Sequence, residues 1–358
     1  MAKLKKASSK QINRLLVIRL SAMGDVAMTV PVLSVLTHQY PDLKVTVLTK
    51  PFFAPLFAQL KNVSVFEAQV KGKHSGVFGL WSLYKELQVL KIDAVADLHN
   101  VLRSKVLKRY FKFEGIPFFQ IDKARAEKKA LTATHNKVFK PLKTTFERYA
   151  DVFEALGFPI NLSISKPLSV EPLSEKTLNV IGKKSKKFVG VAPFAAFEGK
   201  KYPPHLMESV LEKLNNTNKY TILLFGGGDE EEKKLDGFET RFESCINLAG
   251  KLSFSEEISI ISNLEVMLSM DSGNGHLAAM YGVPVITLWG VTHPYAGFYP
   301  FGQKANNALL ADREKYPLVP TSIYGNKMPK GYEKAIATIS PEKVFEKIEN
   351  ILIGKAFQ

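Results

Sequence analysis

Cysteine is nearly absent from this 358-residue sequence, in which Cys245 is the only one. A single thiol excludes an internal disulfide, a cysteine metal cluster and a dithiol redox pair. Long hydrophobic runs are absent as well. No segment reaches the roughly 18 to 20 apolar residues needed to cross a bilayer, and the N-terminus lacks the apolar centre of a secretory signal. We therefore expect the protein to remain in the cytoplasm.

Acidic residues are few relative to basic ones, with 34 Asp and Glu against 49 Lys and Arg. The resulting formal charge of +15 favours anionic partners. Nucleotide diphosphates, phosphorylated glycolipids, acidic membrane surfaces and nucleic acid all satisfy this condition. The charge alone does not choose among them.

The length and the order of the predicted elements indicate two α/β domains. A chain of 358 residues exceeds the size at which one hydrophobic core stops growing. Apolar strands alternate with helices, which is typical of parallel sheets covered by helices. The predicted strands cover residues 14–20, 43–48, 63–66, 94–97, 188–192, 220–225, 246–248, 264–270 and 283–289. The predicted helices cover residues 26–40, 79–90, 101–111, 145–156, 205–214, 255–263, 277–281 and 341–353.

The predicted fold class is therefore α/β, with two doubly wound, Rossmann-like domains facing each other across a cleft. Ligands of such folds bind at the carboxyl ends of the strands. We place an N-terminal domain at residues 1–165, a linker at 166–187 and a C-terminal domain at 188–340. A last amphipathic helix at 341–358 can pack back onto the first domain.

The most informative motif is Asp271-Ser-Gly-Asn-Gly-His-Leu-Ala-Ala279, between a predicted strand and a predicted helix. The first N–H groups of a helix lack intrahelical partners and carry partial positive charge, so a phosphate can bind there when no bulky side chain intervenes. Ser272, Gly273 and Gly275 keep this approach open. The motif predicts a seat for a phosphorylated ligand.

Five more segments, together with the Asp271 motif, follow one another in the same order as in a known family. The chain therefore resembles the inverting ADP-heptose:lipopolysaccharide heptosyltransferases, whose two-domain fold is called GT-B. The segments are Arg19-Leu-Ser-Ala-Met-Gly-Asp-Val26, Asp97-Leu-His-Asn-Val-Leu-Arg-Ser104, Ala192-Pro193 with Lys200-Lys-Tyr-Pro203, Asn247-Leu-Ala-Gly-Lys251 before the Asp271 motif, and Gly290-Val-Thr-His-Pro294 after it. The resemblance covers most of the chain. It implies a glycosyltransferase that moves a heptose or related sugar from an ADP-linked donor to a lipopolysaccharide core acceptor.

Inverting glycosyl transfer needs a base for the acceptor hydroxyl and a group that stabilises the departing diphosphate. Asp25, on a turn after the first strand, matches the family's base, although an Asp here can also cap the following helix. Lys200 matches the family's phosphate lysine, with Lys201 as the other register. Asp25 and Lys200 are thus the predicted catalytic residues.

The resemblance places the donor site in the C-terminal domain. Asp271 is expected to fix its loop by accepting backbone N–H bonds, and His276 to donate to a phosphate or ribose oxygen. A carboxylate at Glu230 or Glu231 would accept the ribose hydroxyls, unless this acidic run is only a solvated surface. The predicted donor-binding residues are Asp271, Ser272, Gly273, Gly275, His276, Lys201, Gly227, Glu230 and Thr292.

An anionic glycolipid is the acceptor that the resemblance implies, and the predicted acceptor-binding residues are Arg103, Lys123 and Arg125. Contact with the inner face of the inner membrane would be peripheral, through basic patches and through Phe52, Phe53 and Phe57 unless these belong to the core. No cofactor and no metal are implied, since the sequence has no Asp-x-Asp triplet and since lysine and helix amides can offset the diphosphate charge. We expect a monomer that binds no nucleic acid.

Two other functions stay open at this point. Pro193-Phe194 and Lys201-Tyr-Pro203 depart from the family pattern, so a transferase or epimerase that uses another nucleotide sugar, such as a UDP-sugar, is the first alternative. A nucleic-acid-binding protein, suggested by the charge alone, is a distant second because no reading motif is present. A dinucleotide oxidoreductase is disfavoured, because no Gly-x-Gly-x-x-Gly follows the first strand.

Overall fold

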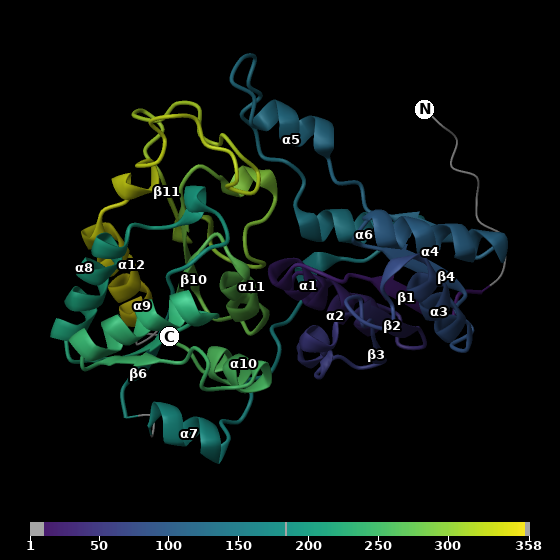
Figure 1. Cartoon of the computed structure of the whole chain (residues 1–358), viewed down its shortest axis with the longest axis horizontal. Helices are drawn as coiled ribbons and strands as arrows, with labels where there is room; N and C mark the ends of the chain where they lie inside the picture. The colour runs from purple at the N-terminus through teal and green to yellow at the C-terminus, as the bar shows by residue number, and fades with distance from the viewer. Residues whose placement is uncertain (1–10, 183–184, 355–358) are drawn as a thin grey trace. The chain divides into compact units, whose positions relative to one another are not determined.

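The computed structural model describes residues 11–182 and 185–354, and it consists of two compact units (Figure 1). Unit 1 comprises Met1–Lys123 and Thr145–Lys166, and unit 2 comprises Ala124–Thr144 and Pro167–Gln358. The segment Ala124–Thr144, which we expected in the N-terminal domain, groups with unit 2. Across the described residues, no helix has the length and apolarity that a bilayer span requires.

Unit 1 is built on a five-stranded parallel sheet of order β3-β2-β1-β4-β5. The strands are β1 (Arg14–Ile18), β2 (Lys44–Thr49), β3 (Val63–Glu67), β4 (Ala94–Asp97) and β5 (Phe118–Gln120). The helices are α1 (Met23–Ala27), α2 (Thr29–Gln39), α3 (Gly76–Gln88), α4 (Leu102–Phe113) and α6 (Thr145–Ala155), with 3-10 turns η1 (Pro51–Phe57) and η2 (Leu162–Ile164). The helix predicted at 26–40 thus begins earlier and is divided at Met28, and β5 was not predicted.

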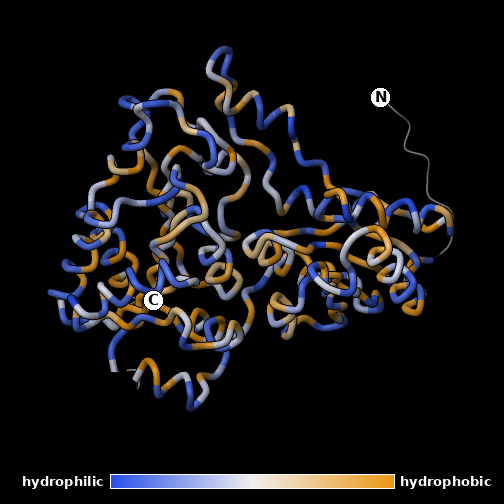
Figure 2. The backbone as a smooth tube through the Cα atoms, in the orientation of Figure 1, coloured by the Kyte–Doolittle hydropathy of each residue, from blue (hydrophilic) through white to orange (hydrophobic). Residues whose placement is uncertain are grey.

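The two faces of this sheet follow from the alternation of side chains along a strand. Leu16 and Ile18 of β1 point to the face covered by α3 and α4, where they pack against side chains such as Leu83 and Phe111. Helix α6 contacts α2 as well as β4 and β5. In Figure 2 many of the helices of both units carry hydrophobic and hydrophilic residues side by side, as expected for helices with one buried face.

Unit 2 is built on a six-stranded parallel sheet of order β11-β10-β9-β6-β7-β8. The strands are β6 (Lys187–Ala192), β7 (Tyr220–Leu224), β8 (Cys245–Asn247), β9 (Val266–Met270), β10 (Val285–Trp289) and β11 (Ala308–Leu310). The helices are α5 (Arg125–Leu131), α7 (Glu175–Ile181), α8 (Pro204–Asn216), α9 (Asp229–Arg241), α10 (Phe254–Ser262), α11 (Gly273–Met280) and α12 (Pro341–Gly354). The 3-10 turns are η3 (Glu198–Lys200), η4 (Pro294–Ala296), η5 (Ala305–Asn307) and η6 (Ile336–Thr338). The sequence patterns did not predict α5, α7, α9 or β11.

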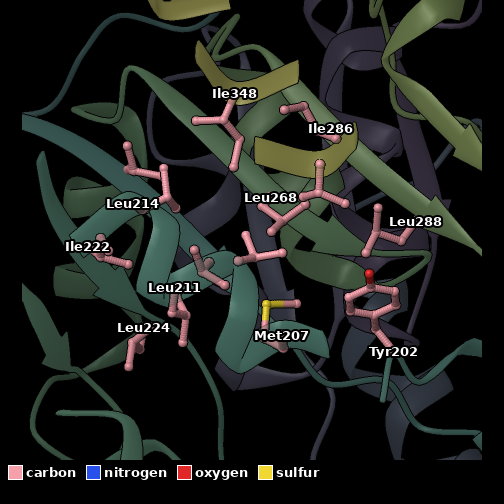
Figure 3. Packing of buried hydrophobic residues seen from close by; sticks show 14 of the residues in the cluster. Tyr202, Met207, Leu211, Leu214, Ile222, Leu224, Leu268, Ile286, Leu288 and Ile348 are labelled. Carbon is pink, nitrogen blue, oxygen red and sulfur yellow. The ribbon is translucent and has the colours of Figure 1, made fainter. Parts of the chain in front are cut away.

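The C-terminal helix α12 packs on unit 2. Its buried residues Val344, Ile348 and Leu352 join one hydrophobic cluster with α8 and with the strands, as Figure 3 shows for Ile348 near Leu268 and Ile286. The element contacts place α12 against α8 and β9. The apolar stripe of this helix, which we expected to pack back onto the first domain, is covered within unit 2.

The segment before α6 is also held by unit 2. Leu131 and Leu142 are buried with Ala296, and the Leu142 N–H donates to the Tyr295 carbonyl at 2.9 Å. The ammonium of Lys128 lies over the Phe298 ring, 4.3 Å from its centroid. Because of these contacts, Ala124–Thr144 belongs to unit 2, although in the sequence it lies between the two parts of unit 1.

Replacing Ile348 by Ala tests the position of α12. The side chain is fully buried, so its truncation should lower the free energy of unfolding of the protein by about 2 to 5 kcal/mol. Ile353 on the same helix is 51% exposed and is the matched control, for which Ile353→Ala should change stability by less than about 0.5 kcal/mol. Urea unfolding followed by circular dichroism measures both. Equal losses would contradict the packing described above.

Candidate active site

In unit 1 the chain order along the sheet reverses between β1 and β4, and the loops that follow these two strands lie at the same edge. Asp25 follows β1, in the first turn of α1. Its Oδ2 atom pairs with the Arg19 guanidinium and accepts the Ala22 N–H at 3.3 Å, so Asp25 does make a helix-capping contact. Both contacts use Oδ2, and the side chain is 27% exposed. The other oxygen, Oδ1, has no partner among the described residues.

Arg19 and Tyr149 hold this turn in place. Arg19 is buried and donates from Nη1 to the Leu98 carbonyl at 2.6 Å, which ties the loop after β1 to the loop after β4. The Tyr149 hydroxyl of α6 donates to the Asp25 carbonyl at 3.2 Å. The carboxylate therefore has a fixed orientation, with one oxygen held and one oxygen open.

Asp97, the last residue of β4, and His99, which follows the strand, belong to a predicted motif but were not among the predicted site residues. The Asp97 carboxylate is fully buried and accepts the backbone N–H groups of His99 and Asn100 at 3.0 and 2.9 Å. His99 Nε2 lies 3.5 Å from the Ser21 hydroxyl, in the Asp25 loop. Burial, with the nearby charges of Arg19 and Lys123, lowers the pKa of His99 to about 3. The signal that could have found His99 is its place after the strand next to β1.

In unit 2 the corresponding reversal lies between β6 and β9, where Ala192 pairs with Ser269. Lys200, from the loop after β6, pairs with the Asp271 carboxylate after β9 at 2.7 Å, and its ammonium also donates to the Asp271 carbonyl at 3.2 Å. Both side chains are largely buried, with exposures of 15% and 8%. Asp271 was expected to accept backbone N–H bonds, and its carboxylate is instead held by Lys200 among the described residues.

The loop that carries Lys200 packs closely against the loop after β10. The Val291 N–H donates to the Gly199 carbonyl at 3.0 Å. A Cβ atom at Gly290 would lie only 2.4 Å from that carbonyl oxygen, so the glycine allows the close approach. Thr292, in the same loop, is buried, and its hydroxyl has no hydrogen-bond partner within the described ranges.

Helix α11 begins directly after Asp271, as the motif predicted. Its N-cap residue Ser272 makes no side-chain cap, because its hydroxyl lies 3.0 Å from the Ser269 hydroxyl. The first N–H groups of the helix, which begins at Gly273, are thus not used by a capping side chain. Gly275 packs near Val285, and His276 is buried in the same turn. The structure therefore brings Lys200, Asp271 and the N-terminus of α11 together.

Lys201 and Glu230 lie apart from this group, on a pocket of about 780 Å³ between α8 and α9. Lys201 pairs with Glu198 and is 41% exposed. Glu230 is exposed in the first turn of α9, whereas the next residue, Glu231, accepts the Gly227 N–H at 2.9 Å. The two registers that the sequence left open are thus distinguishable. Lys200 meets Asp271, and Glu231 rather than Glu230 is engaged by the glycine loop.

The predicted acceptor residues are not in one unit. Arg103, exposed on α4, and Lys123 belong to unit 1, whereas Arg125, exposed at the start of α5, belongs to unit 2. Of the three phenylalanines considered for membrane contact, Phe53 and Phe57 are buried and Phe52 is 56% exposed. Two of the three are therefore core residues.

A comparison with known protein families decides the identity of this arrangement. The model of glycosyltransferase family 9 (heptosyltransferase) matches residues 80–327, which is more than half of the chain. The chain belongs to this family. The predicted resemblance and the enzyme class, a glycosyltransferase, are thereby confirmed.

Known relatives agree with this assignment over nearly the whole length. The lipooligosaccharide heptosyltransferase 2 of Haemophilus influenzae is 28% identical over 362 residues, which cover 94% of this chain and 99% of the relative. The crystal structure of a family 9 glycosyltransferase from Veillonella parvula has a TM-score of 0.75 at 20% identity, covering 98% of this chain and 100% of that one. The Escherichia coli heptosyltransferase WaaC with ADP has a TM-score of 0.67 at 18% identity, covering 94% and 99%. The predicted two-domain α/β fold is confirmed.

Acid should weaken this family 9 glycosyltransferase partly through His99. Because burial and nearby cations keep the folded-state pKa near 3, the unfolded chain binds one more proton between about pH 6.5 and about pH 3. Stability therefore falls as the pH drops through that window, and His99→Gln should reduce the slope by about 1 kcal/mol per pH unit near its middle. Urea unfolding at several pH values measures the slope. Parallel curves for the two proteins would contradict a neutral, buried His99.

Proposed function

We propose that the protein transfers a heptose, with inversion, from ADP-heptose to a lipopolysaccharide core acceptor. The observation that carries the proposal is the Lys200 and Asp271 pair beside the N-terminus of α11, at the point where the strand order of unit 2 reverses. The names of its relatives support the sugar and the acceptor class, and the Escherichia coli enzyme with ADP supports the nucleotide.

The donor diphosphate would bind where a cation and unpaired helix amides converge. Lys200 supplies a full positive charge, and the first N–H groups of α11 supply partial ones. Asp271 holds the lysine in place, so little reorganisation is needed when negative charge develops on the leaving group. Glu230 and Lys201, on the α8 and α9 pocket, are proposed to serve the nucleoside end of the donor.

Asp25 is the proposed base, because its Oδ1 atom is open whereas Oδ2 is held by Arg19 and by the Ala22 N–H. In the proposed step the acceptor hydroxyl oxygen attacks the anomeric carbon of the heptose and its proton passes to Oδ1. The bond between the anomeric carbon and the phosphate oxygen breaks, and ADP leaves with that electron pair. No metal is part of this proposed step, because Lys200 and the α11 amides face the leaving group.

The acceptor side and the location follow from the same proposal. A lipid-anchored acceptor would bring the enzyme to the cytoplasmic face of the membrane, with Arg103, Lys123 and Arg125 as the proposed contacts for its anionic groups. These three side chains stay predictions, as do Gly227, His276 and Thr292 on the donor side.

Asp25→Asn separates catalysis from binding. The amide keeps the shape of the side chain but cannot take a proton, so transfer should fall by a factor of about 100 to 10,000 while ADP affinity stays within about twofold. Radiolabelled heptose transfer and calorimetry measure the two quantities. Retained transfer, or a large loss of ADP binding, would contradict the assignment of Asp25 as the base.

The two adjacent lysines provide a matched pair. Lys200→Met should weaken ADP binding by about tenfold or more, because the diphosphate loses a charged donor and meets an unpaired Asp271. Lys201→Met should weaken ADP binding by less than about threefold, because Lys201 is exposed and paired with Glu198, so water screens its contact with the nucleoside end. The double variant K200M/D271N, which leaves no unpaired charge, distinguishes the loss of the phosphate contact from a folding defect.

Titration with UDP beside ADP tests the first alternative. We expect the wild-type protein to bind ADP more tightly than UDP. If UDP binds more tightly than ADP and this binding still depends on Lys200, the protein is a transferase whose donor is a UDP-sugar.

A further inference from the structure

A second group of cations lies in unit 2, where the segment 124–144 meets the loops that follow β10 and β11. Lys137 donates from its ammonium to the carbonyls of Leu131 and Pro320, both at 2.7 Å. Arg313 donates from Nε to the Val319 carbonyl at 3.0 Å. Because Val319 and Pro320 are consecutive, two cations from distant parts of the chain are anchored on neighbouring carbonyl oxygens.

The guanidinium of Arg313 is oriented by an aromatic ring. Its central carbon lies 3.5 Å from the centroid of the Phe139 ring. Stacking uses the flat face of the group, and the Nε bond uses one of its five N–H donors. The Nη1 and Nη2 groups have no hydrogen-bond partner within the described ranges. They form the two-pronged edge that binds phosphate and carboxylate oxygens.

His293 contributes a donor to the same place. Its ring packs against Phe139 at 5.1 Å between centroids and is only 4% exposed. The Tyr295 N–H donates to His293 Nδ1 at 3.1 Å, so in the neutral ring the proton is on Nε2. The Nε2 atom has no partner in the part of the chain that the structure describes. The ring therefore carries an N–H donor that the protein itself does not use.

The charges in this cluster are all of one sign. Neither Lys137 nor Arg313 forms an ion pair with any described residue. Burial and the charge of Arg313 lower the pKa of Lys137 to about 8. Burial, with the charges of Arg313 and Lys137, lowers the pKa of His293 to about 4. An anion bound here would relieve the repulsion that the fold imposes on these groups.

We propose that Lys137, His293 and Arg313 form a binding site for a phosphoryl group other than the diphosphate of the donor. Three donors from three separate segments suit the three terminal oxygens of a phosphate monoester, whereas a planar carboxylate offers two. The site is distinct from the Lys200 and Asp271 pair, because within the described ranges its three residues form no hydrogen bond or ion pair with either residue. The phosphoryl group comes either from a phosphorylated sugar or from free phosphate.

If a sugar carries the phosphoryl group, this site anchors a phosphorylated acceptor, and that extension rests on the proposed function. The site itself does not rest on it, because phosphate binding can be measured without any transfer. Failure of the proposed function and failure of the site therefore have separate readouts.

The full-length protein labelled with carbon-13 histidine provides the test. The resonance of His293, one of seven histidines, is assigned by its loss in His293→Gln. Inorganic phosphate should shift this resonance in a saturable way, and the shift should persist when ADP is present in excess. Arg313→Gln should weaken the apparent affinity by about tenfold or more, and Arg313→Lys, which keeps the charge but not the fork, by less.

Lys315→Gln is the matched control, because it removes one positive charge from the same loop at a side chain that is 72% exposed and paired with Asp312. It should leave the phosphate affinity within about twofold. Hexose 6-phosphate is the second probe. Saturation at a concentration about tenfold lower than for phosphate identifies a sugar phosphate as the ligand, and equal or weaker binding identifies free phosphate.

Three results would overturn the site. The first is the absence of a saturable shift of the His293 resonance. The second is displacement of phosphate by ADP, which would assign the cluster to the donor. The third is equal weakening by Arg313→Gln and Lys315→Gln, which would show that only the total charge matters.

Discussion

Parallel pairing of two central strands in each sheet is the constraint on which both candidate sites depend. The pairs β1 with β4 and β6 with β9 start their outgoing loops at the same edge, on the two sides of a reversal in strand order. At such a reversal the chain continues to opposite faces of the sheet from the two strands, so the helices leave a crevice at the carboxyl ends of the strands. Asp25 and His99 in unit 1, and Lys200 and Asp271 in unit 2, all occupy these loops.

Each candidate carboxylate is held by a cation, which comes from the same loop for Asp25 and from a neighbouring loop for Asp271. Arg19 fixes Asp25, and Lys200 fixes Asp271. Moving such charges out of water costs several kcal/mol per ion, which a good pair only partly offsets. The arrangement is therefore weak evidence for added stability. It is better explained by geometry, because a fixed carboxylate and a fixed ammonium can meet a substrate without reorganising.

The positive charge of the chain becomes informative only when it is placed on the fold. A formal charge of +15 is compatible with many anionic partners. The structure distinguishes a compensated cation such as Lys200 from Lys137 and Arg313, which form no ion pair with the residues that the structure describes. Uncompensated cations beside a buried histidine are a different kind of feature from solvated surface lysines, whose repulsion water screens.

The sequence alone determined the fold class, the family and most of the residues on each loop, because buried parallel strands are continuous apolar runs and the loops between them carry small and polar residues. It predicted that Asp271 begins a turn into a helix and that Lys200 or Lys201 meets a phosphate. Tertiary structure decided which lysine faces Asp271, which oxygen of Asp25 is open, and that His99 belongs beside Ser21. It also placed α12 and the segment 124–144 on unit 2. These choices depend on contacts between residues distant in the chain, such as Leu142 with Tyr295 and Ile348 with Leu268, and local sequence periodicity carries no information about them.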